Sequence, residues 1–145
     1  MAIKKKAQSS IEFTLLMGFM FLTFNVFLLV VANKVIDVQN QKDMQLIDDL
    51  SYVIKSEITL AAGVGNNYSR TFEIPKTLKG IDYSVTLINS STMKTNYSEL
   101  VLKYVNFTKS HETVKILPKN VDGVINKGEN NITKRNGSIC LNICW

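Results

Sequence analysis

The chain has 145 residues, room for about one domain, and a formal net charge of +5 from 17 Lys+Arg against 12 Asp+Glu. Taken alone, this basic balance raises nucleic-acid binding as a function. A hydrophobic content of 46% excludes a disordered chain, and two cysteines with one histidine are too few for a disulfide scaffold or an array of zinc fingers.

The first predicted element is a long apolar helix behind a short basic run. Lys4, Lys5 and Lys6 precede residues 13–32, which contain 16 apolar residues in 20 and no charge. As a helix this segment rises about 30 Å, enough to cross the hydrocarbon core of a bilayer. Because Lys/Arg-rich flanks stay in the cytoplasm, we expect the N-terminus inside and the chain after about residue 33 outside.

Two general interpretations of this segment stay open. An ordinary secretory signal peptide is cleaved after small residues, which Val30, Val31 and Ala32 supply with cleavage after Ala32. Against it, the apolar run exceeds the usual length of about 7–15 residues, and the acidic Glu12 stands at its start. The second interpretation is an anchor that is never cleaved.

A third interpretation comes from the residues within and just after the basic run. These residues are Lys4, Lys5, Lys6, Ala7, Gln8, Ser10, Glu12 and Leu16. They closely resemble the class III signal peptide of archaeal type IV pilin-like proteins. That family has a basic leader, a small residue and then Gln-x-Ser-x-Glu-x-x-x-Leu at the start of the hydrophobic helix. The resemblance implies cleavage between Ala7 and Gln8 by a prepilin peptidase, which leaves the apolar segment on the mature protein.

Glu12 has the most distinctive chemistry of the motif residues. The resemblance implies that, after cleavage, its carboxylate meets the free N-terminal amine of Gln8 on a neighbouring subunit during assembly. A carboxylate near a helix N-terminus is also favoured by the helix dipole and wetted by lipid headgroups. Both roles of Glu12 stay open.

Beyond the apolar segment the helix continues in amphipathic form to Ala62. Apolar residues recur mostly at spacings of three and four, which is typical of one buried helix face, and the chain has no proline before Pro75. Gly63 and Gly65 predict the helix end. Asp48 and Asp49 are expected on the solvated face. The predicted stripe consists of Val35, Val38, Met44, Ile47, Leu50, Ile54, Ile58 and Ala61.

Residues 66–145 predict a β-rich domain. The Asn136-Gly137 pair between two apolar-rich segments is a strong hairpin signal. We expect five to seven short, mainly antiparallel strands in one twisted sheet, one face of which packs on the helix. The predicted fold class is α+β, a long N-terminal helix followed by a β-sheet head as in the lollipop form of pilins. Strands are predicted at residues 70–74, 81–87, 100–105, 113–117, 121–125, 130–134 and 138–141.

Six Asn-x-Ser/Thr sequons occur in the chain, and all of them lie after the helix. A chain with 14 Asn and 22 Ser plus Thr is expected to contain about two sequons by chance. Such acceptors indicate the surface of an exported domain, although Asn, Ser and Thr also gather at turns. The candidates for N-glycosylation are Asn67, Asn89, Asn96, Asn106, Asn131 and Asn136.

Cys140 and Cys144 are too far apart on an extended strand to bond to each other, at about 13 Å. A turn at residues 141–143 permits a mutual disulfide. Small buried thiols and a disulfide between subunits are the alternatives.

No catalytic, cofactor-binding or metal-binding motif stands out, so we do not expect an enzyme. The one histidine, His111, lies in a polar link and is expected in solvent. Basic residues after the apolar segment alternate with acidic ones and do not favour nucleic-acid binding.

The resemblance therefore implies a structural subunit, major or minor, of an archaeal type IV pilus-like filament with a role in adhesion. The expected regions are a cleaved leader (1–7), a membrane and filament-core helix (8–32), its amphipathic continuation (33–62) and an extracellular head (66–145). Expected partners are other copies of the chain, the prepilin peptidase and assembly machinery, and the cell membrane before assembly. The alternative is a monomeric, membrane-anchored extracellular binding module.

Overall fold

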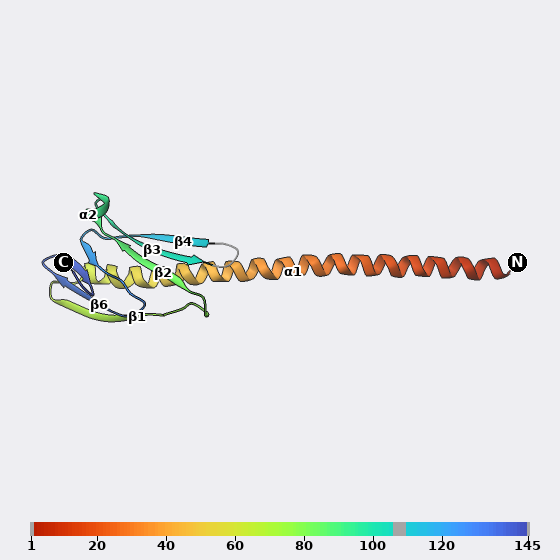
Figure 1. Ribbon diagram of the computed structural model, residues 1–145, viewed down its shortest axis with the longest axis horizontal. Helices are drawn as coiled ribbons and strands as arrows, with labels where there is room; N and C mark the ends of the chain where they lie inside the picture. Colours follow the sequence, from red (N-terminus) through yellow and green to blue (C-terminus); the bar gives the residue numbers. More distant parts are fainter. Residues whose placement is uncertain (1, 106–109, 145) are drawn as a thin grey trace. The chain divides into compact units, whose positions relative to one another are not determined.

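The computed structural model describes residues 2–105 and 110–144, and describes side chains from Ser10 to Tyr104 and from His111 to Cys144 (Figure 1). The chain forms two compact units, Met1–Lys42 and Asp43–Trp145. The helix α1 (Ala2–Gly63, 62 residues) supplies all the described residues of the first unit and the first element of the second.

α1 ends one residue beyond the predicted end. No proline interrupts it, because the first proline of the chain is Pro75. After Gly63 the backbone turns through Asn67, whose φ of 66° is in the left-handed region that asparagine tolerates better than most residues. The predicted combination of a long N-terminal helix with a following domain rich in antiparallel strands is confirmed.

Among the described residues of the second unit, seven strands form two sheets. The four-stranded sheet has the order β1-β6-β7-β5 and contains β1 (Tyr68–Ile74), β6 (Gly128–Arg135), β7 (Ser138–Leu141) and β5 (Val121–Gly123). The three-stranded sheet has the order β2-β3-β4 and contains β2 (Tyr83–Ile88), β3 (Ser98–Val105) and β4 (Ser110–Leu117). All neighbours are antiparallel except β5 and β7.

The prediction of a single sheet is therefore wrong. β1 pairs with β6, so the whole three-stranded sheet is inserted in the chain between two partners of the other sheet. Alternation of apolar residues identifies strands but not their partners, because pairing over this distance depends on the folded chain. A short helix, α2 (Ser90–Met93), connects β2 to β3.

The predicted hairpin at Asn136-Gly137 is confirmed. Both residues have positive φ, 49° for Asn136 and 81° for Gly137. Positive φ at both central residues is required by the tight turn whose twist matches that of the flanking strands. The turn joins β6 to β7, with Arg135 opposite Ser138.

Glycine is required at position 123 in β5 because the backbone of the neighbouring strand comes very close. A Cβ at this position would lie 2.1 Å from the carbonyl oxygen of Leu141 on the adjacent β7.

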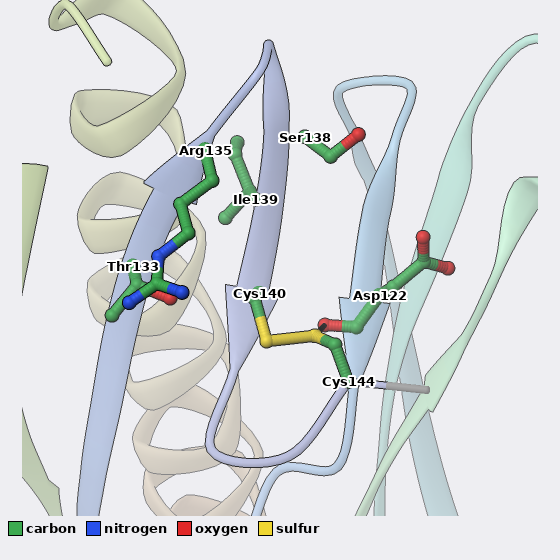
Figure 2. A pocket seen from close by; sticks show the side chains of 7 residues that line it. All are labelled: Asp122, Thr133, Arg135, Ser138, Ile139, Cys140 and Cys144. Carbon is green, nitrogen blue, oxygen red and sulfur yellow. Dashed lines mark hydrogen bonds between the residues drawn. A yellow bond between two sulfur atoms is a disulfide. The ribbon is translucent and has the colours of Figure 1, made fainter. Parts of the chain in front are cut away.

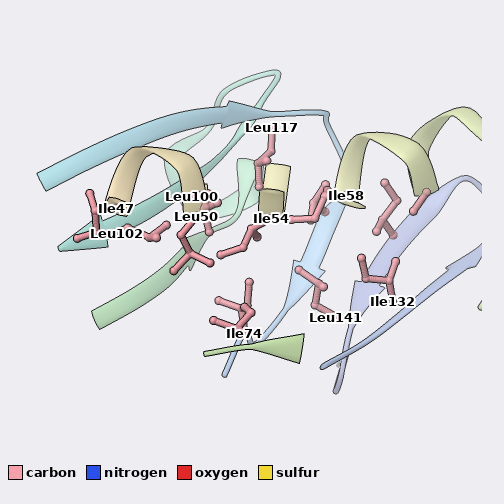
Figure 3. Close-up of a cluster of buried hydrophobic side chains, with 14 of the residues drawn as sticks. Ile47, Leu50, Ile54, Ile58, Ile74, Leu100, Leu102, Leu117, Ile132 and Leu141 are labelled. Carbon is pink, nitrogen blue, oxygen red and sulfur yellow. The ribbon is translucent and has the colours of Figure 1, made fainter. Parts of the chain in front are cut away.

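One apolar core joins α1 to both sheets (Figure 3). In β3, Ser98, Leu100, Leu102 and Tyr104 point inward and are at most 4% exposed, as expected for alternating side chains. Every strand contributes at least one core residue. The core comprises Ile47, Leu50, Ile54, Ile58, Ala61, Ile74, Tyr83, Leu100, Leu102, Tyr104, Leu117, Val121, Ile125, Ile132, Ile139 and Leu141.

The buried stripe of α1 is shorter than predicted. It begins at Ile47, whereas Val35 and Val38 are 54% and 47% exposed. These two valines belong to the first unit, which contains no strand to cover them among its described residues. The apolar surface of the first unit therefore extends past Ala32.

Candidate functional site

The first candidate site is the surface of α1 over residues 13–32. Its large apolar side chains are between 41% (Val31) and 71% (Phe21) exposed. The helix is long and apolar enough to cross a membrane. A helix that is apolar on all sides requires lipid or other apolar helices around it.

The polar side chains within this segment bond to the helix itself. The Thr14 hydroxyl donates to the Ser10 carbonyl at 2.9 Å, and the Thr23 hydroxyl donates to the Met20 carbonyl at 2.9 Å. The Asn25 amide donates to the Phe21 carbonyl at 2.7 Å. These bonds reduce the cost of placing the three side chains in apolar surroundings, a property that composition alone does not reveal.

The motif residues lie in the first turns of α1. The backbone of Lys4, Lys5, Lys6, Ala7 and Gln8 is helical, and their side chains are outside the described set. Ser10, Glu12 and Leu16 are exposed, Leu16 at 61%. Glu12 follows Gln8 by four residues, so the two positions are on one face of the helix, one turn apart.

A shallow apolar groove of about 430 Å³ follows this segment in the first unit. Four of the seven lining residues are valines, and two are lysines. The sequence interpretation missed it because it assigned residues 33–38 to the stripe that packs on the head. The groove is lined by Val30, Val31, Lys34, Val35, Val38, Gln39 and Lys42.

In the second unit a lysine caps the end of α1. Lys134 Nζ on β6 donates to the carbonyl oxygens of Ala62 and Val64, each at 2.6 Å. Carbonyls at a helix C-terminus have no partner within the helix, and a cation there also interacts favourably with the helix dipole. Lys134 lies 72 residues after Ala62, so the sequence offers no local signal for this cap.

Asp48 was expected in solvent but binds α1 to β4. Thr113 Oγ1 donates to Asp48 Oδ1 at 2.9 Å, and Lys115 Nζ lies 3.1 Å from the same oxygen. The hydrogen bond from Thr113, followed by that from Lys115, lowers the pKa of Asp48. Burial acts to lower the pKa of Lys115, but its hydrogen bonds to Asp48 and Tyr52 outweigh burial and raise it.

His111, also expected in a solvated link, lies in β4 opposite Tyr104 and is partly buried. Desolvation, followed by the nearby Asp43 carboxylate, raises the pKa of Tyr104, whose hydroxyl donates to Asp43 at 3.5 Å. Desolvation and then Asp82 raise the pKa of Tyr83 to about 12, and its hydroxyl donates to the Pro75 carbonyl. Both tyrosines are neutral hydrogen-bond donors near pH 7.

Cys140 and Cys144 form a mutual disulfide, one of the three alternatives the sequence left open. A left-handed turn at Asn142 (φ 58°) brings their Cα atoms to 5.7 Å. The Asn142 side chain accepts from the backbone N–H of Asn131 and donates to the carbonyl of Val124, both at 2.8 Å. The C-terminal segment is therefore fastened to β6 and to the residue after β5.

A polar hollow of about 360 Å³ adjoins this disulfide on the outer face of the four-stranded sheet (Figure 2). Thr133 and Ser138, which provide the hydroxyls of the sequons at Asn131 and Asn136, both line it. Thr133 and Arg135 are two residues apart on β6, so their side chains are on the same face of the sheet. The lining consists of Asp122, Thr133, Arg135, Ser138, Ile139, Cys140 and Cys144.

The sequon asparagines differ in accessibility. Asn67, Asn96, Asn131 and Asn136 are exposed, whereas Asn89, next to α2, is partly buried. Asn131 lies within β6, and the other exposed three are outside strands. Asn106 is outside the described residues.

Together these observations define an α+β protein in which a long apolar helix precedes a domain of mainly antiparallel strands. Over the described part of the chain, no group of three His, Cys, Asp or Glu side chains could hold a metal ion. No family model, curated protein or solved structure matches this chain.

Proposed function

We propose that this protein is a structural subunit, major or minor, of an archaeal type IV pilus-like filament. The N-terminal helix sits in the cell membrane before assembly. A prepilin peptidase removes residues 1–7, and the assembly machinery then packs the helices of many copies together. The head is extracellular in the filament and contributes to adhesion.

One observation carries the proposal, namely that a single helix provides both an apolar surface exposed on all sides and the buried stripe of a folded head. A signal peptide cleaved after Ala32 would discard the first of these surfaces. A subunit that is stored in lipid and later packs against its own copies needs both. The Gln8, Ser10, Glu12 and Leu16 motif supports the same proposal.

Glycans on the head are part of the proposal. The exposed Asn67, Asn96 and Asn136 lie in turns or loops, where an acceptor side chain is accessible. Asn131 is exposed but lies within β6, and Asn89 is partly buried, so neither is in an open loop. Glycans at these sites would cover the outer wall of a filament.

N-terminal sequencing and intact mass of the protein from the cell surface test these points together. The filament subunit begins at Gln8 and carries hexose-sized additions. A chain that begins at Met1 or Ala2 indicates the anchored module, and one that begins at Asn33 indicates ordinary secretion. A bare peptide mass would remove the glycans from the proposal and leave the filament.

Glu12→Ala tests the assembly role of the carboxylate. We expect export and cleavage to be unchanged and filament yield, measured by electron microscopy and shearing, to fall at least tenfold. Asp37→Ala, which removes an exposed carboxylate later in the same helix, is the matched control and should assemble normally. Wild-type yield from Glu12→Ala would exclude the carboxylate from assembly.

A second candidate is a monomeric, membrane-anchored binding module. The polar hollow beside the disulfide favours it, because a concave surface with Asp122, Arg135 and two hydroxyls suits a small polar ligand. Monomeric protein with an intact N-terminus at the cell surface would select this candidate.

A further inference from the structure

The turn between β6 and β7 contains a chemically reactive pair of residues. Of the 14 asparagines in the chain, only Asn136 precedes a glycine. In an Asn-Gly pair the backbone nitrogen of the glycine reaches the side-chain carbonyl carbon of the asparagine easily, because glycine has no side chain to block the approach and adopts many backbone conformations. Asn136 and Gly137 are both exposed, so water also has access to the pair. The sequence therefore marks Asn136 as the asparagine most prone to lose its side-chain amide.

The reaction at this pair exchanges ammonia for water. The Gly137 nitrogen attacks Cγ of Asn136, so that a new N–Cγ bond forms and the bond from Cγ to Nδ2 breaks. The Nδ2 group takes up the proton that the Gly137 nitrogen loses and leaves as ammonia, and a succinimide ring remains. Water then opens the ring and leaves aspartate or isoaspartate at position 136. The attack requires that the Gly137 nitrogen is free to turn toward the asparagine side chain.

In the folded protein the N–H group of Gly137 is held by a residue 71 positions earlier in the chain. It donates to Oδ1 of Asn66 at 3.0 Å. Asn66 lies between the end of α1 and the start of β1, and the next residue, Asn67, donates its own N–H to the carbonyl of Lys134 on β6 at 2.9 Å. The segment after α1 is therefore bonded to the hairpin at two points, and the Gly137 nitrogen can attack only after one of these bonds opens.

Asn66 is held in place from both sides. Before it, Lys134 Nζ binds the carbonyls of Ala62 and Val64. After it, β1 pairs with β6 from Tyr68 onward. The Asn66 side chain is exposed, so its bond to the turn depends on this positioning rather than on burial.

We propose that Asn66 protects Asn136 from the loss of its side-chain amide by holding the N–H group of Gly137. Asn66 is a positioning residue, because it acts on the attacking nitrogen and does not touch the Cγ atom that is attacked. The protection is a property of the head and does not depend on the proposed filament.

Loss of the amide at this position would damage the head in two ways. Isoaspartate adds a main-chain carbon to a turn whose length sets the pairing of β6 with β7, where Arg135 lies opposite Ser138. The same strand contains Ile139 of the core and Cys140 of the disulfide. Aspartate keeps the chain length but lacks the amide nitrogen to which an N-linked glycan is attached. Protection by Asn66 therefore preserves both the hairpin and the acceptor of its sequon.

Mass spectrometry of the full chain in detergent tests the protection. The chain is made in a host without N-glycosylation, incubated at mildly alkaline pH and digested, and the fraction of the Asn136 peptide that contains aspartate or isoaspartate is measured over time. Asn66 is exposed and is not among the residues with positive φ, so alanine fits its backbone. Asn66→Ala should raise the rate about twofold to tenfold, the factor that corresponds to one hydrogen bond. Asn66→Asp keeps an oxygen acceptor and should stay close to the wild-type rate.

Ile54→Val separates protection of the turn from overall stability, because it weakens the core and leaves Asn66 unchanged. It should not alter the rate. Equal rates in wild type and Asn66→Ala, or an equal rise in Ile54→Val, would overturn the proposal. If Asn66→Ala does not fold, hydrogen exchange of the Gly137 N–H in the wild type tests the bond directly. Slower exchange than in the urea-unfolded chain is expected, and exchange as fast as in that chain would overturn the proposal.

Discussion

The two halves of α1 differ in what surrounds their apolar side chains. Over residues 13–32 the large apolar side chains are all at least 41% exposed, whereas Ile47, Ile54 and Ile58 in the second half are completely buried. The first half is apolar on all sides, and the second has one buried stripe. The same regular helix thus serves two environments, because the distribution of apolar residues around it changes from one half to the other.

Paired truncations in the two halves should have the largest difference in effect. Ile54→Ala removes a fully buried side chain and should lower the free energy of unfolding of the head by about 3–4 kcal/mol. Leu22→Ala, at a position that is 62% exposed, should change it by less than about 0.5 kcal/mol. Chemical denaturation of the full chain in detergent measures both.

Equal effects of Ile54→Ala and Leu22→Ala would contradict the division of α1 into an exposed and a buried half. Ile54→Val is a milder variant, with an expected loss of about 1 kcal/mol, and remains measurable if Ile54→Ala does not fold.

Removing the disulfide should have the next largest effect on the head. Replacing both Cys140 and Cys144 with Ser opens a small loop, for which the loss of chain constraint corresponds to about 2 kcal/mol. Reduction of the wild-type protein should have a similar effect, and the reductant should leave the double variant unchanged. A head of unaltered stability would show that the bonds of Asn142 hold the C-terminal segment without the disulfide.

The Lys134 cap on the end of α1 should contribute less to the stability of the head than the disulfide does. Lys134→Met keeps most of the aliphatic side chain but leaves the carbonyls of Ala62 and Val64 without this donor. We expect a loss of about 1–2 kcal/mol in the free energy of unfolding. Lys119→Met, at an exposed position, is the control and should be neutral within about 0.5 kcal/mol.

Replacing Asp48 should have the smallest effect on the free energy of unfolding of the head, and this effect should depend on pH. Because its pKa is lowered in the folded protein, Asp48 stabilises the head above its unfolded pKa of about 3.8, and this contribution is lost as pH falls through the lower folded pKa. The pair is partly exposed, so Asp48→Asn should cost only about 0.5–1 kcal/mol at pH 7. Urea denaturation at pH 7 and pH 3 should show a smaller difference between variant and wild type at the lower pH.

Several errors of the sequence interpretation have a common physical cause. His111 looks like a residue of a solvated link until β4 is paired with β3. The Asp48 side chain remains 47% exposed, as expected for the solvated face, but its partners on β4 could not be predicted. The apolar Val35 and Val38 continue the helical stripe in sequence, but the described residues of the first unit include no strand that covers them. Local periodicity indicates which residues share a face, and it does not indicate which partner reaches that face.

The sequence by itself determined the long helix, its end to within one residue, the approximate positions of the seven described strands and the turn at Asn136. These features follow from local spacing, the absence of proline and backbone preferences. Only the tertiary structure decided that the strands form two sheets, that Lys134 caps α1, and that Cys140 pairs with Cys144. These features join residues that are distant in the chain or depend on a particular turn. Their partners are selected by the packing of the whole head, which local patterns do not encode.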